Sequence, residues 1–421
     1  MSEHYDALET RDPAEREAAL MAALPAQVAR AQRTTAYAEI LSGIDAASVG
    51  SRAALAQLPV TRKSQLLERQ KAARTAGGDP FGGFAAVGWS GLAVSRGARR
   101  VFQSPGPIYE PAGQGADYWR FGRALFAAGL RAGELVHNSF SYHLTPAGSM
   151  VETGAHAIGC TVFAGGVGNT ELQLQAIADL RPQAYAGTPS FLRILLEKAD
   201  ETGLALPSLC KASVGGEAFP PALRDALSAR GIQAYQSYGT ADLGLVAYET
   251  TARQGLVLDE GVIVEIVRPG TGDPVAEGEV GELVVSVLGP DYPLLRFGTG
   301  DLSALLPGSC PSGRTNTRIK GWMGRADQTA KVRGMFVYTS QIAEVLRRHP
   351  EIARARLVIE GEMANDRMTL HVEAAGVPEG LADAVVLSLR EVTKLRGAVQ
   401  IEAPGTLPND GKIIEDTRPV G

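Results

Sequence analysis

The sequence predicts an α/β protein, with a large N-terminal domain of mainly parallel sheets flanked by helices and a small α+β C-terminal domain. Two observations carry this prediction. Helix-like and strand-like segments alternate five times between residues 117 and 239. After Gly244 the chain changes to short β-rich segments separated by turns, and its last part mixes helices and strands again. We therefore expect one domain over residues 1–326, with a small β subdomain at about 245–320, and a second over 327–421.

Length and composition bound the class of protein. A chain of 421 residues is too long for one ordinary core, and 45% hydrophobic with 21% charged residues excludes wholesale disorder. Since 41 basic and 46 acidic side chains give a net charge of -5, we expect neither nucleic acid nor an anionic membrane as a partner. The acidic, polar N-terminus and the lack of a long apolar run predict a cytoplasmic protein.

The N-terminal part is predicted to be helical and then irregular. Residues 12–42 place Ala and Leu at helical spacing, which predicts one or two surface helices. Pro59 precedes Thr61 and Ser64, either of which could cap a further helix. Residues 76–97 are glycine-rich and aperiodic, so we expect loops and short strands across an exposed face, and residues 100–111 predict a strand followed by a turn.

The alternating region predicts a largely parallel sheet with both faces covered by helices. The expected helices span residues 117–130, 149–159, 169–180, 190–203 and 220–231, and the expected strands span 134–140, 160–165, 183–188, 210–217 and 233–239. Ligands of such sheets bind beyond the carboxyl ends of the strands. The segments that reach that edge are residues 141–143, 187–188, 215–217 and 237–242.

A basic stretch precedes the last part of the chain. It combines glycines with cations and is expected to run directly into an amphipathic helix; the residues are Lys320, Gly324, Arg325, Lys331, Arg333 and Gly334. Glycine lets the backbone approach an anion, and guanidinium groups pair with phosphate in bidentate fashion. The alternative is a charged surface turn. Beyond it we expect a helix, strands 353–360 and 367–374, helix 380–393, strand 399–403 and a polar tail.

Several motifs occur in the order and spacing of one known family. They include LLRFGTGDLSALLPG, GRADQTAKVRG and LPNDGKIIE, together with SVGGEAFPPALR and YQSYGTADLGLVAYE. From about Leu135 to the C-terminus the chain resembles the adenylate-forming (acyl-CoA synthetase) superfamily, more closely its phenylacetate-CoA ligase branch. The resemblance implies that the C-terminal domain is a mobile lid.

The resemblance implies a nucleotide site. Asp301 matches the aspartate that accepts both ribose hydroxyls, although an Asp beside Gly is also common in turns. The residues that match the adenine platform and its continuation are Gly215, Gly216, Glu217, Ser237, Tyr238, Gly239 and Thr240. Arg325 matches the arginine that meets the phosphate, and Asp327 the hinge of the lid. Lys412 matches the lysine that reaches the carboxylate and α-phosphate; its alternative is a solvated tail lysine.

The ATP end departs from the family pattern. Where relatives carry a Ser, Thr and Gly loop ending in Lys, this chain reads RVFQSPGPIYEP, which retains Ser104 and Gly106 but no lysine. In YGTAD, Ala241 replaces the phosphate-binding hydroxyl, and Asp242 takes the place of the magnesium-binding glutamate. No zinc is expected, because the segment AYETTARQGLVLDE has none of the cysteines and histidines that relatives carry there.

The resemblance also places an aromatic-lined acid pocket beside NSFSYHLTP. The candidates are Phe140, Tyr142, His143 and Tyr235, for each of which plain core packing is the alternative. The predicted function is an AMP-forming acid-thiol ligase that activates a small aromatic or hydrophobic carboxylic acid with Mg2+ and ATP and transfers it to coenzyme A; a carrier protein is the alternative acceptor. The alternative is a family member that does not hydrolyse ATP and acts as a nucleotide- or acyl-adenylate-binding protein or an acyl transferase. We expect a monomer or homodimer.

Overall fold

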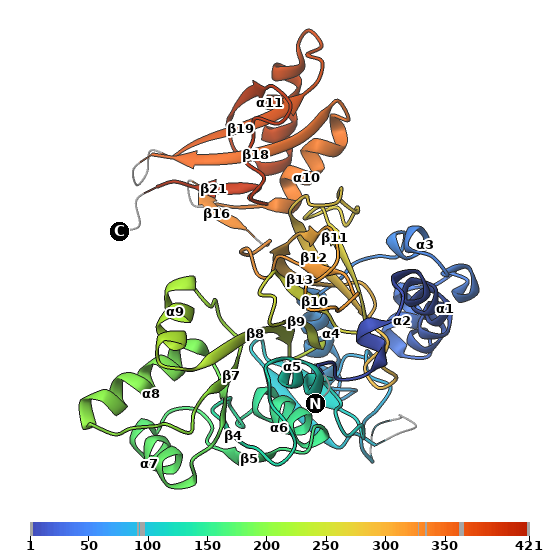
Figure 1. Ribbon diagram of the computed structural model, residues 1–421. Helices are drawn as coiled ribbons and strands as arrows, with labels where there is room; N and C mark the ends of the chain where they lie inside the picture. The colour runs from blue at the N-terminus through green and yellow to red at the C-terminus, as the bar shows by residue number, and fades with distance from the viewer. Residues whose placement is uncertain are drawn as a thin grey trace. The chain divides into compact units, whose positions relative to one another are not determined.

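The computed structural model describes residues 3–90, 92, 97–326, 328–332, 335–361 and 366–418 (Figure 1). It forms two compact units, which are described separately. The first comprises residues 1–264, 285–297 and 306–321, and the second comprises 265–284, 298–305 and 322–421. The second unit therefore combines the C-terminal part of the chain with two segments of the β-rich region.

The first unit opens with helices, as predicted. They are η1 Ala7–Thr10, α1 Pro13–Ala31, α2 Thr35–Ile40, η2 Ala46–Ser48, α3 Arg52–Ala56 and α4 Lys63–Thr75. Neither predicted cap begins α4, because Thr61 belongs to the short strand β1 (Thr61–Arg62) and donates its N–H to Arg296 O at 2.9 Å. Residue Arg62 occupies the cap position instead.

Residues 76–90, 92 and 97 are irregular, as predicted, but they do not merely cross an exposed face. Phe81 and Phe84 are fully buried, and Phe84 packs edge-on against Tyr37 with ring centroids 5.4 Å apart. The next segment is a hairpin, because β2 (Arg100–Ser104) pairs antiparallel with β3 (Ile108–Ala112). The predicted strand and turn are therefore followed by a second strand.

The alternating helices and strands are present in the predicted order. They are α5 Phe121–Ala127, β4 Leu135–Asn138, α6 Ala147–Ala157, β5 Thr161–Ala164, α7 Thr170–Leu180, β6 Ala184–Gly187, α8 Pro189–Thr202, β7 Lys211–Val214, α9 Pro221–Ala229 and β8 Gln233–Thr240. The pairs β5–β4, β4–β6, β6–β7 and β7–β8 are parallel. The predicted parallel sheet is confirmed over these five strands.

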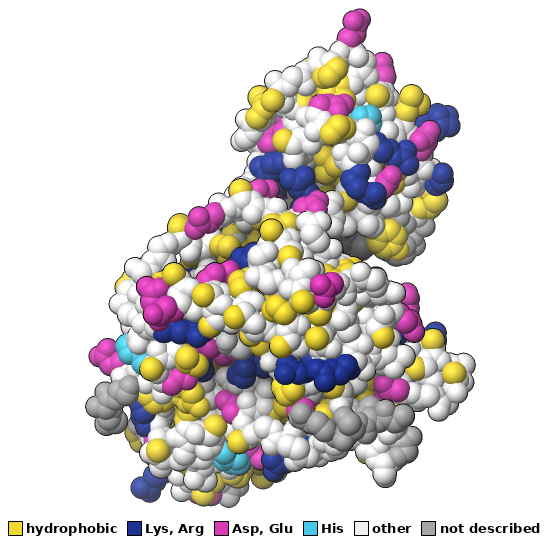
Figure 2. All heavy atoms as spheres, turned by 90° about the vertical axis from the view of Figure 1, so that its right-hand side faces the viewer, with side chains coloured by type: hydrophobic (Ala, Val, Ile, Leu, Met, Phe, Trp, Pro, Cys, Tyr) yellow, Lys and Arg dark blue, Asp and Glu magenta, His cyan; other side chains and the backbone are white. Residues whose placement is uncertain are grey.

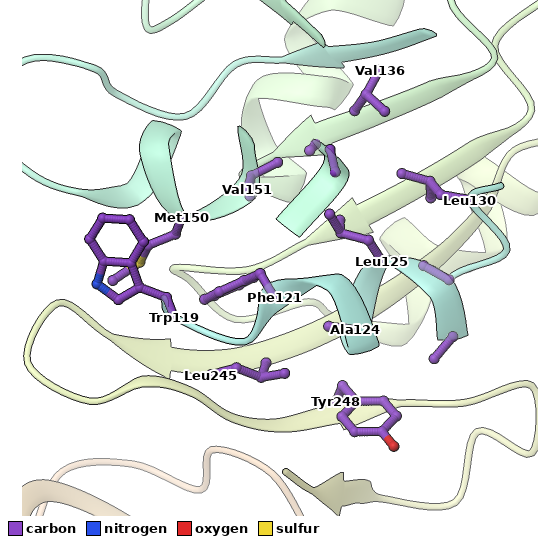
Figure 3. Packing of buried hydrophobic residues seen from close by; sticks show 14 of the residues in the cluster. Trp119, Phe121, Ala124, Leu125, Leu130, Val136, Met150, Val151, Leu245 and Tyr248 are labelled. Atoms are coloured by element: carbon purple, nitrogen blue, oxygen red, sulfur yellow. The ribbon is translucent and has the colours of Figure 1, made fainter. Parts of the chain in front are cut away.

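Both faces of the central strands β4, β6 and β7 are largely buried. Successive side chains of a strand point to opposite faces, so each face packs against its own set of residues. In β6, Ala184 and Ala186 join one apolar cluster, and Tyr185 joins another. The first cluster contains residues of α5 and α6, and Figure 3 shows Phe121 and Leu125 gathered with neighbours from α6. The second contains residues of α7, α8 and α9, which lie on the other side of the strands in Figure 1.

The β-rich region is divided between two sheets. β9 (Gly244–Glu249), β10 (Leu256–Leu258), β14 (Leu305–Leu306) and β15 (Arg318–Ile319) extend the large sheet, whose order is β14-β15-β10-β9-β8-β7-β6-β4-β5. β9 returns antiparallel to β8 after a tight turn. β11 (Val262–Val267), β12 (Gly281–Val287) and β13 (Phe297–Ser303) form a second sheet in the order β1-β13-β12-β11.

The second unit contains the predicted C-terminal helices and strands. They are β16 Thr329–Val332, β17 Met335–Tyr338, α10 Thr339–Arg348, β18 Ile352–Glu360, β19 Arg367–Ala374, α11 Leu381–Thr393, β20 Ala398–Glu402 and β21 Ile414–Asp416. Two details differ from the prediction. β16 lies within the basic stretch and β17 stands between that stretch and α10, and part of the polar tail forms β21, which pairs parallel with β18.

The visible surface mixes charges of both signs. Figure 2 shows Lys and Arg side chains interspersed with Asp and Glu on the face that it presents. Among the described helices, none is long and apolar enough to cross a membrane.

A buried ionic cluster fixes the N-terminal segment of the first unit. The Glu9 side chain is 0% exposed; it pairs with Arg314 at 2.9 Å and with Arg123 at 3.4 Å. The hydroxyl of Tyr248 donates to Glu9 at 2.9 Å. Since buried charges are tolerated only when paired, Glu9 compensates the distant Arg314 and shares Arg123 with Asp6 and Asp259.

Glu9→Ala should lower the free energy of unfolding by about 3–5 kcal/mol, because it leaves buried guanidinium charge uncompensated. Urea denaturation would measure the change. Glu201→Ala is the matched control: Glu201 pairs with Lys198 at the surface, and its loss should change stability by less than about 1 kcal/mol. Equal effects of the two substitutions would contradict the assignment.

Candidate active site

In the second unit, Asp301 and Arg325 form a direct ion pair. Arg325 Nη1 donates to Asp301 Oδ1 at 3.0 Å. Backbone pairing beside β13 fixes this geometry, because Met323 N donates to Leu302 O at 2.9 Å and Ala326 N to Gly300 O at 2.7 Å. Two residues that the sequence singled out for ribose and phosphate binding are therefore brought together.

The glycine before Asp301 allows the close approach of the arginine. Gly300 has a φ of +73°, and a Cβ at this position would lie 2.6 Å from Arg325 Nη2. A larger residue would therefore be strained and would displace the guanidinium group.

Trp322 is a contact of Asp301 that the sequence analysis missed. Its indole Nε1 donates to Asp301 Oδ1 at 3.1 Å, and its side chain is about half exposed. The available signal was a tryptophan inside the glycine-rich segment GWMGR, next to motif residues. Asp301 Oδ1 thus accepts hydrogen bonds from both Trp322 and Arg325.

Lys412 lies on a loop that the Gln328 side chain holds. Gln328 Oε1 accepts from the N–H groups of Ile413 and Ile414, both at 2.7 Å. Its Nε2 donates to Gly411 O at 3.2 Å and to Arg325 O at 3.1 Å. The backbone of the lysine loop is therefore tied to the backbone of the Arg325 segment, a link that the sequence analysis did not foresee.

The Lys412 ammonium itself is half exposed and pairs with Glu415 Oε1 at 3.3 Å. It lines a small cavity of about 60 Å³ together with Arg268 and Arg354. The predicted hinge residue Asp327, and Arg333 and Gly334 of the basic stretch, lie outside the described residues.

In the first unit, the predicted adenine-binding glycines lie at the carboxyl ends of the parallel strands. A Cβ on Gly215 would be 3.0 Å from Ser237 O. Gly216 has a φ of +80°, and a Cβ there would contact Phe140 at 3.7 Å. Glu217 Oε1 accepts from Ser190 N at 2.6 Å, so its carboxylate fixes the start of α8. The fold thus groups these residues as expected.

β8 ends at the same edge of the sheet, and Asp242 follows it by two residues. Tyr238 pairs with Ala247 across a bulge, and the Thr240 hydroxyl accepts from Leu243 N at 3.1 Å. Thr240 therefore closes the turn that carries Asp242, and this use of its hydroxyl was not predicted.

Asp242 has the properties of a cation ligand. Its side chain is 1% exposed, and Lys63 Nζ donates to Oδ2 at 3.3 Å. The other oxygen, Oδ1, is buried and has no hydrogen-bond partner among the described residues. Burial raises the pKa of the Asp242 carboxyl, and the Lys63 ammonium opposes that rise. An orphaned buried carboxylate oxygen fits a Mg2+ ion, which prefers carboxylate and phosphate oxygens.

The hairpin that stands in place of the phosphate loop adds a second buried acid. Glu110 is 2% exposed, and its Oε1 accepts from the Ser104 hydroxyl, whereas its Oε2 has no hydrogen-bond partner in the part of the chain that the structure describes. Burial, and then repulsion from Asp242, raise the pKa of Glu110 to about 8. Sequence reasoning considered Ser104 here but missed Glu110 and Lys63, because no spacing pattern links residues 63, 110 and 242.

The four aromatic-pocket candidates have different surroundings. Phe140 lies beside Gly216, and both it and Tyr235 pack against the apolar cluster shown in Figure 3. The Tyr142 hydroxyl accepts from Asn138 Nδ2 at 2.8 Å, and burial raises the pKa of Tyr142. His143 is exposed.

A cavity of about 340 Å³ lies in the first unit next to Asp242. Its charged lining comes from Asp117, Arg120, Asp242 and Asp291, and its aromatic lining from Tyr118, Trp119 and Tyr292. Among the described residues, no three His, Cys, Asp or Glu side chains form a group that could hold a metal. A cation at Asp242 would therefore take its remaining ligands from water or substrate.

Known proteins share this sequence pattern. Residues 140–290 match the family model of the AMP-binding enzymes. The phenylacetate-coenzyme A ligase of Thermus thermophilus is 35% identical over 262 residues, which are 60% of this chain and 59% of that enzyme. The phenylacetate-coenzyme A ligase of Aromatoleum evansii is 30% identical over 347 residues, 79% of this chain and 74% of that enzyme.

Solved structures share the fold. An open conformation of 2-hydroxyisobutyryl-CoA ligase in complex with 2-HIB-AMP and CoA has a TM-score of 0.71 and 24% identity, and covers 97% of this chain and 92% of that chain. At that identity the likeness supports the fold alone. The sequence relatives go further: the chain belongs to the adenylate-forming superfamily, in the phenylacetate-coenzyme A ligase-like branch of AMP-forming acyl-CoA ligases.

Proposed function

We propose that this ligase activates a small aromatic or otherwise hydrophobic carboxylic acid with Mg-ATP and transfers the acyl group to the thiol of coenzyme A. The observation that carries the proposal is the grouping of Asp301 and Arg325, with the Lys412 loop tied to the Arg325 segment by Gln328. A carboxylate can accept hydrogen bonds from the ribose hydroxyls of a nucleotide, and a guanidinium and an ammonium in the same unit can pair with its phosphates.

Each group has a defined role in this proposal. Asp301 accepts the ribose hydroxyls, Arg325 pairs with the phosphate, and the adenine lies along residues 215–217 and 237–240. The substrate carboxylate attacks the α-phosphorus and pyrophosphate leaves, while Lys412 stabilises the developing charge. The thiol then attacks the acyl carbon, and AMP leaves. Asp242 would hold Mg2+, which neutralises phosphate charge.

The adenylation step requires no protein nucleophile, because the attacking carboxylate belongs to the substrate. We propose that the lid turns about Asp327 between the two half-reactions and so withdraws Lys412 from the site. Coenzyme A is the proposed acceptor, and the phosphopantetheine arm of a carrier protein presents the same thiol.

The proposed preference for aromatic acids rests on side chains near residues 215–217, along which the adenine is proposed to lie. Phe140 lies beside Gly216, and Tyr235 belongs to the same apolar cluster, with the Arg253 guanidinium 5.3 Å above its ring. Flat hydrophobic surfaces favour a flat hydrophobic acid. The names of the T. thermophilus and A. evansii relatives, both phenylacetate-coenzyme A ligases, point the same way.

One observation favours a second candidate function. The phosphate-loop position is a tight hairpin, and its turn contains Pro105 and Pro107, which have no N–H to donate to a phosphate. A protein with this hairpin could bind an acyl adenylate or transfer an acyl group without hydrolysing ATP.

Thermal unfolding with Mg-ATP, AMP or a non-hydrolysable acyl-adenylate analogue separates the two functions without knowledge of the acid. A ligand at 100 times its dissociation constant stabilises by about 2.7 kcal/mol, which raises Tm by a few degrees. We expect protection by Mg-ATP that is lost in Asp301→Ala and retained in Asp273→Ala, an exposed aspartate of the same unit. Protection by AMP or the analogue alone would support the second function.

Lys412→Ala should slow adenylation by about 10²–10³-fold and leave thioester formation from a supplied acyl adenylate nearly unchanged. Pyrophosphate release measures the first half-reaction, and thioester yield the second. Lys394→Ala, at an exposed lysine of the same unit, should affect neither. An equal loss in both half-reactions would argue against a role confined to adenylation.

A panel of acids tests the substrate class. Phenylacetate and benzoate should give a kcat/KM for AMP release at least about tenfold higher than acetate or 2-hydroxyisobutyrate. Phe140→Ala should reduce this preference, mainly by raising KM for the aromatic acids. A preference for the aliphatic acids would overturn the aromatic assignment and leave the ligase assignment intact.

A further inference from the structure

The Gln328 side chain holds the backbone on both sides of Lys412. Its Oε1 accepts from Ile413 N and Ile414 N, both at 2.7 Å, and its Nε2 donates to Gly411 O at 3.2 Å. The peptide groups before and after the lysine are therefore fixed by one amide. Removing that amide would leave two backbone N–H groups without this acceptor.

The contacts of the ammonium group do not fix Lys412 to the same degree. The side chain is half exposed, and its Nζ pairs with Glu415 Oε1 at 3.3 Å. Exposed ion pairs of this kind contribute little to holding a long side chain in one geometry. The position of the ammonium therefore depends mainly on where the backbone of its loop lies.

Other contacts seat the lysine loop on its unit. Gly411 has a φ of +71°, and a Cβ there would lie 2.5 Å from Val280 Cγ1. Val280 N donates to Asn409 Oδ1 at 3.2 Å, and Leu357 N donates to Ile413 O at 2.7 Å. These contacts join the loop to β18 and to the start of β12. We therefore expect the loop to stay attached, but less precisely placed, when the Gln328 amide is removed.

Gln328 also joins the loop to the Arg325 segment. Its Nε2 donates to Arg325 O at 3.1 Å, and the Arg325 guanidinium pairs with Asp301 at 3.0 Å. One amide thus connects the loop of the proposed catalytic lysine with the residues proposed to bind phosphate and ribose. In the proposed reaction these groups act on one nucleotide, and a displacement of about 1 Å can slow such a reaction by about 10²-fold.

We propose that Gln328 is a positioning residue for adenylation, which aligns the Lys412 ammonium with the phosphate held by Arg325. It acts through the backbone of the lysine loop. The inference rests on the proposed function, because Lys412 and Arg325 take their roles from it. Gln328 directly follows the proposed hinge residue Asp327, so its bonds to the lysine loop lie on the lid side of the hinge and can persist while the lid turns.

Gln328→Leu keeps a side chain of similar size and removes the hydrogen bonds of the amide. Pyrophosphate release should slow by about 10- to 100-fold, and thioester formation from a supplied acyl adenylate should stay nearly unchanged. Gln328→Glu retains an acceptor for the two N–H groups, so it should lose less. An equal loss in both half-reactions would overturn the proposal.

A double-mutant cycle tests whether Gln328 acts through Lys412. In the Lys412→Ala background, Gln328→Leu should slow adenylation by less than about twofold, because the ammonium that it positions is gone. A structural role unrelated to the lysine would slow both backgrounds by the same factor, and that result would overturn the proposal.

Gln341→Leu is the matched control. Gln341 is half-buried in the same unit, and it also bridges two segments: its Oε1 accepts from Tyr338 N and its Nε2 donates to Val392 O, both at 3.0 Å. Its loss should lower Tm about as much as that of Gln328 but leave adenylation unchanged. A loss of adenylation equal to that of Gln328→Leu would overturn the proposal.

Amide hydrogen exchange tests the positioning without acid, nucleotide or coenzyme A. The N–H groups of Ile413 and Ile414 should exchange at least about tenfold faster in Gln328→Leu than in the wild type, and at the wild-type rate in Gln341→Leu. Unchanged exchange in Gln328→Leu would overturn the positioning alone. Absence of adenylation by the wild type would instead overturn the proposed function, and with it the catalytic role of Gln328, so the two failures are distinguishable.

Discussion

The burial of both faces of the central parallel strands β4, β6 and β7 is the constraint on which the first unit depends. Because helices cover each face, polar groups can emerge only where the strands end. The glycines at 215 and 216, Glu217 and the β8 residues Tyr238 to Thr240 all reach that edge. The same apolar cluster that supports the sheet also holds Phe140 and Tyr235 beside it. In this unit, the same apolar packing therefore supports the sheet and positions side chains of the candidate site.

In the second unit, a few specific hydrogen bonds, rather than a buried sheet, bring the candidate site residues together. A short backbone pairing beside β13 brings Arg325 to Asp301, and one glutamine amide connects that segment to the Lys412 loop. Gln328 uses both its oxygen and its nitrogen in these contacts, so a hydrophobic residue could not replace it without orphaning backbone groups. The Trp322 and Arg325 donors keep Asp301 oriented in the absence of a nucleotide.

The phosphate end shows how a site can change its chemistry while the surrounding fold persists. The hairpin β2–β3 has no lysine and two prolines in its turn, yet it places Glu110 near Asp242, and α4 begins with Lys63 bound to the same aspartate. Burial raises the pKa of both acids, and the Lys63 ammonium opposes the rise at Asp242.

The sequence alone determined the alternation of helices and strands, the parallel sheet and the family, because these depend on local periodicity and on motifs read within short windows. It also identified Asp301 and Arg325, which the fold then brought together. Only the tertiary structure decided that the 76–97 segment buries Phe81 and Phe84, that β16 and β17 precede α10, and that the β-rich region divides between two sheets. It alone revealed Trp322, Gln328, Lys63 and Glu110 as contacts of the candidate site. These depend on which distant segments meet and which buried polar atoms remain unpaired, and no spacing along the chain records either property.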